Sequence, residues 1–278
     1  MAESDPAGEY FDLGTYARTV TTRSPEAQVW FDRGLNWTYA FNHEEAADCF
    51  TRAIDLDAAC AMAYWGLAYA LGPNYNKPWE AFEQAELVTS VERTHDAVQR
   101  ALTVADASPV EQALIRALRF RYPEGFPAED CAIWNEPYAE AMASVYADHP
   151  DDVDVAVLYA DALLNLTPWQ LWDLATGDPA PGSRALEARA VLDRALALPG
   201  GSEHPGVLHL YIHLMEMSAT PEQALPLADR LRGLVPDGGH LQHMPTHLDV
   251  LCGDYRSVVA GNLDAIRARV GDRVVLAA

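Results

Sequence analysis

Apolar residues recur at three- and four-residue spacing through most of the 278-residue chain, and alanine and leucine are the commonest of them. Runs in which β-branched and polar residues alternate are missing. Glycine and proline gather at intervals, for example at Gly72-Pro73 and from Pro199 to Pro205, and separate helical stretches of about a dozen residues. The pattern therefore predicts an all-α fold without a β-sheet.

A set of small and aromatic residues recurs with a period of about 34 residues. The first unit begins at Ala27, and small residues stand where its two antiparallel helices would approach each other, with Phe50 filling the remaining gap: Gly34, Ala46 and Ala53. Later units begin near Ala61, Pro205 and Gly239. Inserts at 72–90 and 166–183 interrupt the register between them.

These offsets resemble the tetratricopeptide repeat (TPR) family. The sequence also resembles one bacterial subgroup of that family in four motifs: WTYAFNHEE (37–45), GPNYNKPW (72–79), NLTPWQLWD (165–173) and GHLQHMPTH (239–247). The resemblance implies a right-handed α-solenoid of TPR-like helix pairs over residues 27–272, after an N-terminal extension (1–26) and before a tail (273–278). It also implies that the second, fifth, ninth and twelfth positions of each first helix line a concave groove. We infer no enzymatic activity from this resemblance.

The last repeat has no polar capping helix after it, although a solenoid needs one to cover its final apolar face. Val258, Leu263 and Ile266 would then be uncovered. We expect either a homo-oligomer formed through this face or fraying beyond Arg269.

Two histidine pairs stand in the same register of the last two units. His209 and His213 occupy the fifth and ninth positions of one unit, and His243 and His247 occupy those of the next. The i, i+4 spacing puts each pair on one face of a helix. Because the two helices would be neighbours, the sequence predicts that all four imidazoles converge on one transition-metal ion.

Imidazole nitrogens suit copper or zinc, with iron as an alternative. His240 and Glu216 lie close enough in sequence to add ligands or partners of the ligands. Pro245 limits this prediction, because a proline kinks a helix unless it falls in the first turn. If the helix starts later than Gly239, His240 and His243 leave the predicted face. The competing interpretation is that the histidines are hydrogen-bonded packing residues, copied when the repeat was duplicated.

Aromatic and polar residues are predicted to line the rest of the groove. Trp and Tyr offer rigid contact area with a polar tip, as in ligand pockets, although they equally suit packing of the inserts. The candidates are Trp65 and Tyr69 of the second unit, Asn74, Tyr75, Asn76, Lys77 and Trp79 of the first insert, Trp169 and Trp172 of the second, and His43 at the groove mouth. The remaining histidines, His95, His149 and His204, are expected at the surface.

The net charge of −22 argues against nucleic-acid or membrane-surface partners. The four cysteines form no C-x-x-C pair, which excludes a zinc ribbon, and the sequence has no phosphate-binding loop and no nucleophile elbow. The first residues lack a secretory signal, so we expect a cytoplasmic protein.

Two functions follow from these features. The first is a groove that binds a small molecule together with a histidine-held transition metal, which leaves open whether the protein is a metal-dependent enzyme. The alternative is an adapter whose groove grips a peptide or partner helix without metal. A purely structural module of a larger assembly is a third interpretation.

Overall fold

The structure is a computed structural model that describes residues 10–268. Within that range the chain forms thirteen α-helices and four short 3-10 helices and no β-strand, which confirms the all-α class. The α-helices are α1 (Pro25–Tyr39), α2 (His43–Leu56), α3 (Ala61–Leu71), α4 (Gln84–Thr103), α5 (Pro109–Arg121), α6 (Asn135–Asp148), α7 (Val153–Leu164), α8 (Ala185–Ala197), α9 (Pro205–Met215), α10 (Leu225–Leu231), α11 (Gly239–His243), α12 (Pro245–Leu251) and α13 (Tyr255–Arg267). The 3-10 helices are Trp79–Ala81, Cys131–Trp134, Gly201–Glu203 and Pro221–Ala224.

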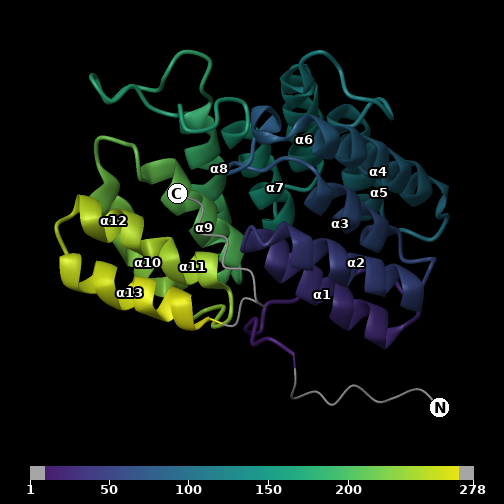
Figure 1. The fold of residues 1–278 in the computed structure, drawn as a ribbon, viewed down its shortest axis with the longest axis horizontal. Coiled ribbons are helices and arrows are strands. Elements are labelled where there is room, and N and C mark those ends of the chain that lie inside the picture. Colours follow the sequence, from purple (N-terminus) through teal and green to yellow (C-terminus); the bar gives the residue numbers. More distant parts are fainter. Residues whose placement is uncertain (1–9, 269–278) are drawn as a thin grey trace.

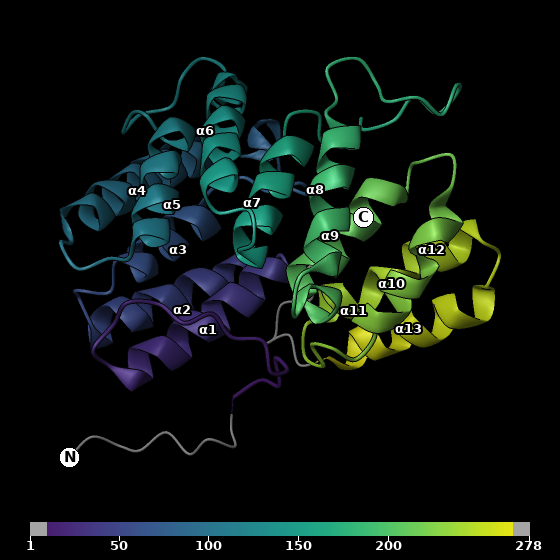
Figure 2. The same cartoon turned by 180° about the vertical axis from the view of Figure 1, so that it is seen from behind.

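Most helices that follow one another in the chain pack against one another, and the molecule has two halves (Figure 1). Helices α1 to α7 form one half and α8 to α13 the other, as the reverse view also shows (Figure 2). The halves meet where α8 packs against α7 and where α9 lies against α7 and against α1. Elements from the start and the end of the chain therefore lie side by side.

The packing of the first three helices centres on the Phe50 ring. Gly34 on α1 and Gly66 on α3 both face this fully buried side chain. A Cβ atom would come within 2.8 Å of the ring at Gly34 and within 2.4 Å at Gly66, closer than real Cβ contacts. Only glycine allows α1 and α3 to approach α2 this closely.

Residues 10–24 form no helix or strand and lie at the junction of the halves before α1 begins at Pro25, with Ser24 as its N-cap. Tyr16 and Arg18 of this segment donate hydrogen bonds of 2.6 Å each to the buried Asp154 carboxylate on α7. His204, the N-cap of α9, lies 3.2 Å from the same carboxylate and is only 2% exposed. The expectation of a surface His204 is therefore wrong, because the side chain is used as a cap.

The last helix, α13, leaves apolar side chains uncovered. Val259, Leu263 and Ile266 are 45–64% exposed, while Val258 is half-buried. Association through this face stays a prediction, and the expected fraying beyond Arg269 and the tail 273–278 lie outside the described residues. Within the described part of the chain, none of the helices has the length and apolar character needed to cross a membrane.

Candidate metal centre

Helix α9 carries His209 and His213 inside the molecule. It is apolar on every side and all its residues are buried, as expected for a helix between two halves of a core. His209 Nδ1 lies 2.7 Å from the main-chain oxygen of Tyr39, the last residue of α1. A carbonyl oxygen only accepts, so Nδ1 carries the proton and the lone pair is on Nε2.

His213 is oriented by a carboxylate. Its Nδ1 donates to Glu216 Oε1 over 2.9 Å, which leaves the buried Nε2 atom of His213 without a hydrogen-bond partner. Burial alone would raise the pKa of Glu216, but hydrogen bonds from His213 and His247 lower it to about 2. The carboxylate is therefore charged and acts as an acceptor from both imidazoles.

His240 completes a three-histidine cluster from α11. Its Nε2 lies 3.1 Å from His209 Nε2, and the ligand nitrogens of His209, His213 and His240 all lie within 4.8 Å of one another. Two nitrogens bonded to one zinc ion at about 2.0–2.1 Å are about 3.3–3.4 Å apart in tetrahedral geometry. The spacing of the His209 and His240 nitrogens is thus close to that of a metal site, and the third nitrogen, from His213, lies within 4.8 Å of both.

His209 and His240 are neutral imidazoles. Burial first, and the neighbouring imidazoles second, hold the pKa of His209 and of His240 well below the ordinary histidine value. Neutral imidazole is the form that binds metals, so protons compete little for these two nitrogens near neutral pH.

Phe41, at the turn between α1 and α2, contacts all three imidazoles of this cluster. These contacts were not predicted from the sequence. The Phe41 ring lies 4.4 Å from that of His209, 5.6 Å from that of His213 and 5.5 Å from that of His240, measured between centroids. Its φ is 53°, a left-handed conformation that is costly for a bulky residue. The sequence carries no signal for this contact, because it joins elements far apart in the chain.

The two inserts cover the cluster from outside. The Tyr75 ring lies 4.8 Å from that of His213, and Trp169 packs on Tyr75 at 5.2 Å. Asn76 Nδ2 lies 3.5 Å from His240 Nε2. Tyr75 Oη and Asn76 Oδ1 are buried polar atoms without a hydrogen-bond partner, so both are available to a small ligand.

His243 and His247 lie beside this cluster and not in it. The proline at 245 lacks an N–H group, and the helix that the sequence predicts as continuous ends at His243 and restarts as α12. His240 therefore faces α9 in the place where His243 was expected. His243 Nε2 and His247 Nε2 face each other at 2.9 Å, and His247 Nδ1 hydrogen-bonds Glu216 Oε2.

Other predicted groove residues form a separate buried group around α3 and α5. Trp65 and Tyr69 stack on each other at 5.2 Å, and the Arg121 guanidinium lies 4.6 Å from the Tyr69 ring. The Tyr69 hydroxyl donates to the Asp161 carboxylate. Trp79 packs on the Trp134 and Tyr122 rings. These aromatic residues serve internal packing.

The remaining candidates are tied into the fold. Lys77 pairs with Glu86 and lies over the Phe82 ring, so its charge is matched within the chain. The Trp172 indole donates to the Leu214 carbonyl over 2.6 Å and fastens the second insert to α9. Asn74 Oδ1 accepts from the N–H groups of Asn76 and Lys77 and shapes the first insert.

His43 is the first residue of α2 and is half-buried next to Phe41. Its Nδ1 donates to the Ala70 carbonyl over 2.9 Å, and its Nε2 has no partner. Burial, with the nearby Arg121 charge, lowers its pKa to about 4. It is a neutral imidazole near the three-histidine cluster but not a member of it.

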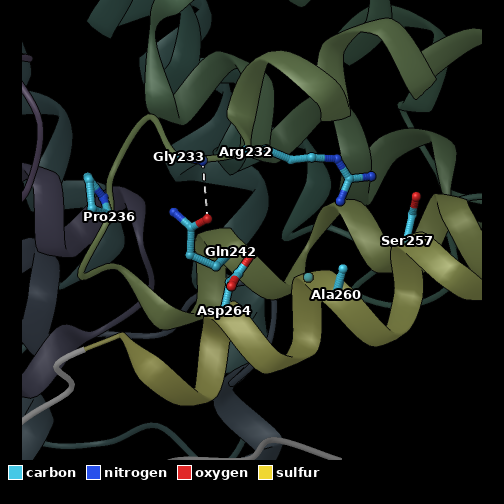
Figure 3. A pocket seen from close by; sticks show the side chains of 8 residues that line it. Arg232, Gly233, Pro236, Gln242, Ser257, Ala260 and Asp264 are labelled. Carbon is cyan, nitrogen blue, oxygen red and sulfur yellow. Dashed lines mark hydrogen bonds between the residues drawn. The ribbon is translucent and has the colours of Figure 1, made fainter.

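A surface hollow between α10, α11 and α13 shows how α11 is held (Figure 3). Gln242 points into the loop before α11, where its Oε1 accepts from Gly233 N over 3.1 Å and its Nε2 donates to the Val235 carbonyl over 2.8 Å. These bonds fix the helix that carries His240 and His243. The polar groups of Gln242 are used inside the protein.

Comparison with known protein families gives no match for this chain, and comparison with curated proteins gives none either.

Proposed function

We propose that this chain is a metal-binding helical-repeat protein in which His209, His213 and His240 hold one transition-metal ion, copper or zinc. The observation that carries the proposal is the convergence of three ligand nitrogens from two helices within 4.8 Å. His209 and His213 each have Nδ1 fixed as a donor, to a carbonyl and to a carboxylate, as is usual for imidazoles that bind metal.

Three imidazoles leave one position of a tetrahedral site for water or a small ligand, which is the arrangement of catalytic zinc. Tyr75 Oη and Asn76 Oδ1 are unpartnered polar atoms beside it. We propose that a small ligand binds there, and that the metal acts on it as a Lewis acid. The peptide-adapter alternative is less well supported, because Trp65 and Tyr69, which were expected to line an open groove, are at most 5% exposed.

The proposal includes the TPR-like solenoid and a cytoplasmic location. The solenoid is supported by the first helix pair, where Gly34 faces the Phe50 ring and Ala46 and Ala53 are fully buried, as the repeat requires.

The test is the metal content of untagged protein after equilibration with Zn²⁺, with affinity measured by competition against a chelator. We expect His209→Gln and His213→Gln to lower the affinity by at least about 100-fold, since each removes a ligand and not only its support. His149→Gln, a change at a partly exposed helix-end residue, is the matched control and should leave binding unchanged. If both site variants keep wild-type affinity and a wild-type helical spectrum, the proposal is wrong.

A further inference from the structure

The hydrogen bonds of His243 define where its proton lies. Its Nδ1 is 2.7 Å from Asn262 Oδ1, and Asn262 Nδ2 donates to the Val258 carbonyl, which establishes that the amide oxygen is the atom facing the imidazole. The Thr246 hydroxyl donates to the His243 carbonyl and so can only accept from Nδ1. His243 Nδ1 therefore carries the proton, and Nε2 carries the lone pair.

The same reasoning applies to His247. Its Nδ1 hydrogen-bonds Glu216 Oε2, and a carboxylate only accepts. Its Nε2 also carries a lone pair. Two nitrogen lone pairs thus face each other across 2.9 Å, an arrangement that repels unless a positive charge lies between them.

We infer that His243 and His247 hold a second transition-metal ion beside the first, and that the Glu216 carboxylate joins the two sites. With metal–nitrogen bonds of about 2.0–2.1 Å, two nitrogens 2.9 Å apart subtend an angle of about 90° at the ion. That angle is typical of tetragonal Cu²⁺. Both imidazoles are partly exposed, so water can fill the other positions.

Glu216 explains why two ions can be neighbours. One carboxylate oxygen accepts from His213, a proposed ligand of the first ion, and the other accepts from His247 of the second pair. Its negative charge lies between the two sites and offsets part of their repulsion. This link rests on the proposed function, whereas the His243–His247 pair stands without it.

The experiment is the number of Cu²⁺ ions that stay with untagged protein after gel filtration. We expect two ions per chain for the wild type, one for His243→Gln, one for His209→Gln and none for the double variant. His149→Gln should keep two, which controls for copper on an accessible histidine. Circular dichroism checks that each variant keeps its helices.

Each outcome separates the two sites. One ion in the wild type that His209→Gln loses and His243→Gln keeps would overturn the second site, and the His243–His247 contact would then be a proton-bridged pair. One ion with the opposite pattern would overturn the first site and support the second. No bound ion would overturn both. Should His243→Gln not fold, Asn262→Ala keeps both imidazoles but frees His243 Nδ1, and it should weaken one ion only; unchanged binding would count against the inference.

Discussion

At the scale of single residues, Glu216 decides which nitrogens are available for binding. It is 8% exposed and accepts from two imidazoles, and those hydrogen bonds hold its pKa near 2 against the effect of burial. Because it only accepts, it forces both partners to carry a proton on Nδ1. The lone pairs of His213 and His247 are thereby directed away from it.

Glu216→Gln tests this role. An amide offers one oxygen and one N–H group, so one of the two imidazoles must face a donor in place of an acceptor. We expect copper affinity to fall about 10- to 100-fold at one site and to change little at the other. Chelator competition measures both affinities, and Glu222→Gln at an exposed position is the control. Unchanged affinity at both sites would show that Glu216 does not orient the ligands.

At the scale of helices, the sequence predicts one half of the site and misplaces the other. His209 and His213 lie together because i, i+4 spacing on an unbroken helix suffices to pair them. The position of His240 depends on where α11 ends, which the missing N–H of Pro245 determines. Spacing counted as if the helix were continuous therefore selects His243 for a place that His240 takes.

The three-helix packing around Phe50 gives a prediction at the same scale. Gly66→Ala puts a methyl group against the Phe50 ring and should destabilise the fold by about 1–3 kcal/mol. In a Phe50→Leu background the ring is absent, so Gly66→Ala should lower the free energy of unfolding by less than it does in the wild type. Urea unfolding of the four variants measures this coupling. Gly125→Ala, where a Cβ meets an ordinary 3.5 Å contact, should be nearly neutral. Equal costs in both backgrounds would exclude the ring as the cause.

At the scale of the whole molecule, long-range contacts close the two halves on each other. The Tyr39 carbonyl and His209 are 170 positions apart in sequence, and Asp154 joins the N-terminal segment, α1, α7 and α9. Helical periodicity reports only neighbours within a few turns, so neither contact could be read from it. The all-α class depends on local sequence patterns and could be predicted. The junction of the two halves depends on contacts between distant residues and could not be predicted.

Asp154→Asn should show how much this junction contributes. The side chains of Tyr16, Tyr39 and Arg18 all donate to the carboxylate, and the amide would turn an N–H toward one of them. We expect a loss of about 3–5 kcal/mol, as for breaking a buried ion pair. Asp151→Asn removes only an exposed pair with Arg194 and should cost less than about 1 kcal/mol.

The contribution of Asp154 to the free energy of unfolding should also depend on pH. Burial raises the pKa of Asp154, but hydrogen bonds from His204 and Tyr16 and the Arg18 charge hold it well below its usual range. A depressed pKa contributes stability that is fully present above about pH 4 and is lost as the pH falls toward the folded-state value. The stability difference between wild type and Asp154→Asn should therefore shrink between about pH 5 and pH 2. A constant difference across that range would contradict the assignment.

The aromatic cover over His213 has a kinetic consequence. His209 and His213 have no exposed surface, and Tyr75 and Trp169 lie over the cluster, so we expect an ion bound there to leave when this cover opens. Release of the first ion to a chelator should then be slow and first order, at a rate independent of chelator concentration. Trp169 has a φ of 62°, which glycine adopts without strain, so Trp169→Gly should speed release while the backbone keeps its path. Stopped-flow release curves measure both rates, and a rate proportional to chelator concentration would mean that the ion is reached without any opening. The protein would in that case exchange its metal freely with the solution. A gated site instead keeps its ion when the protein is diluted or when free metal is briefly scarce.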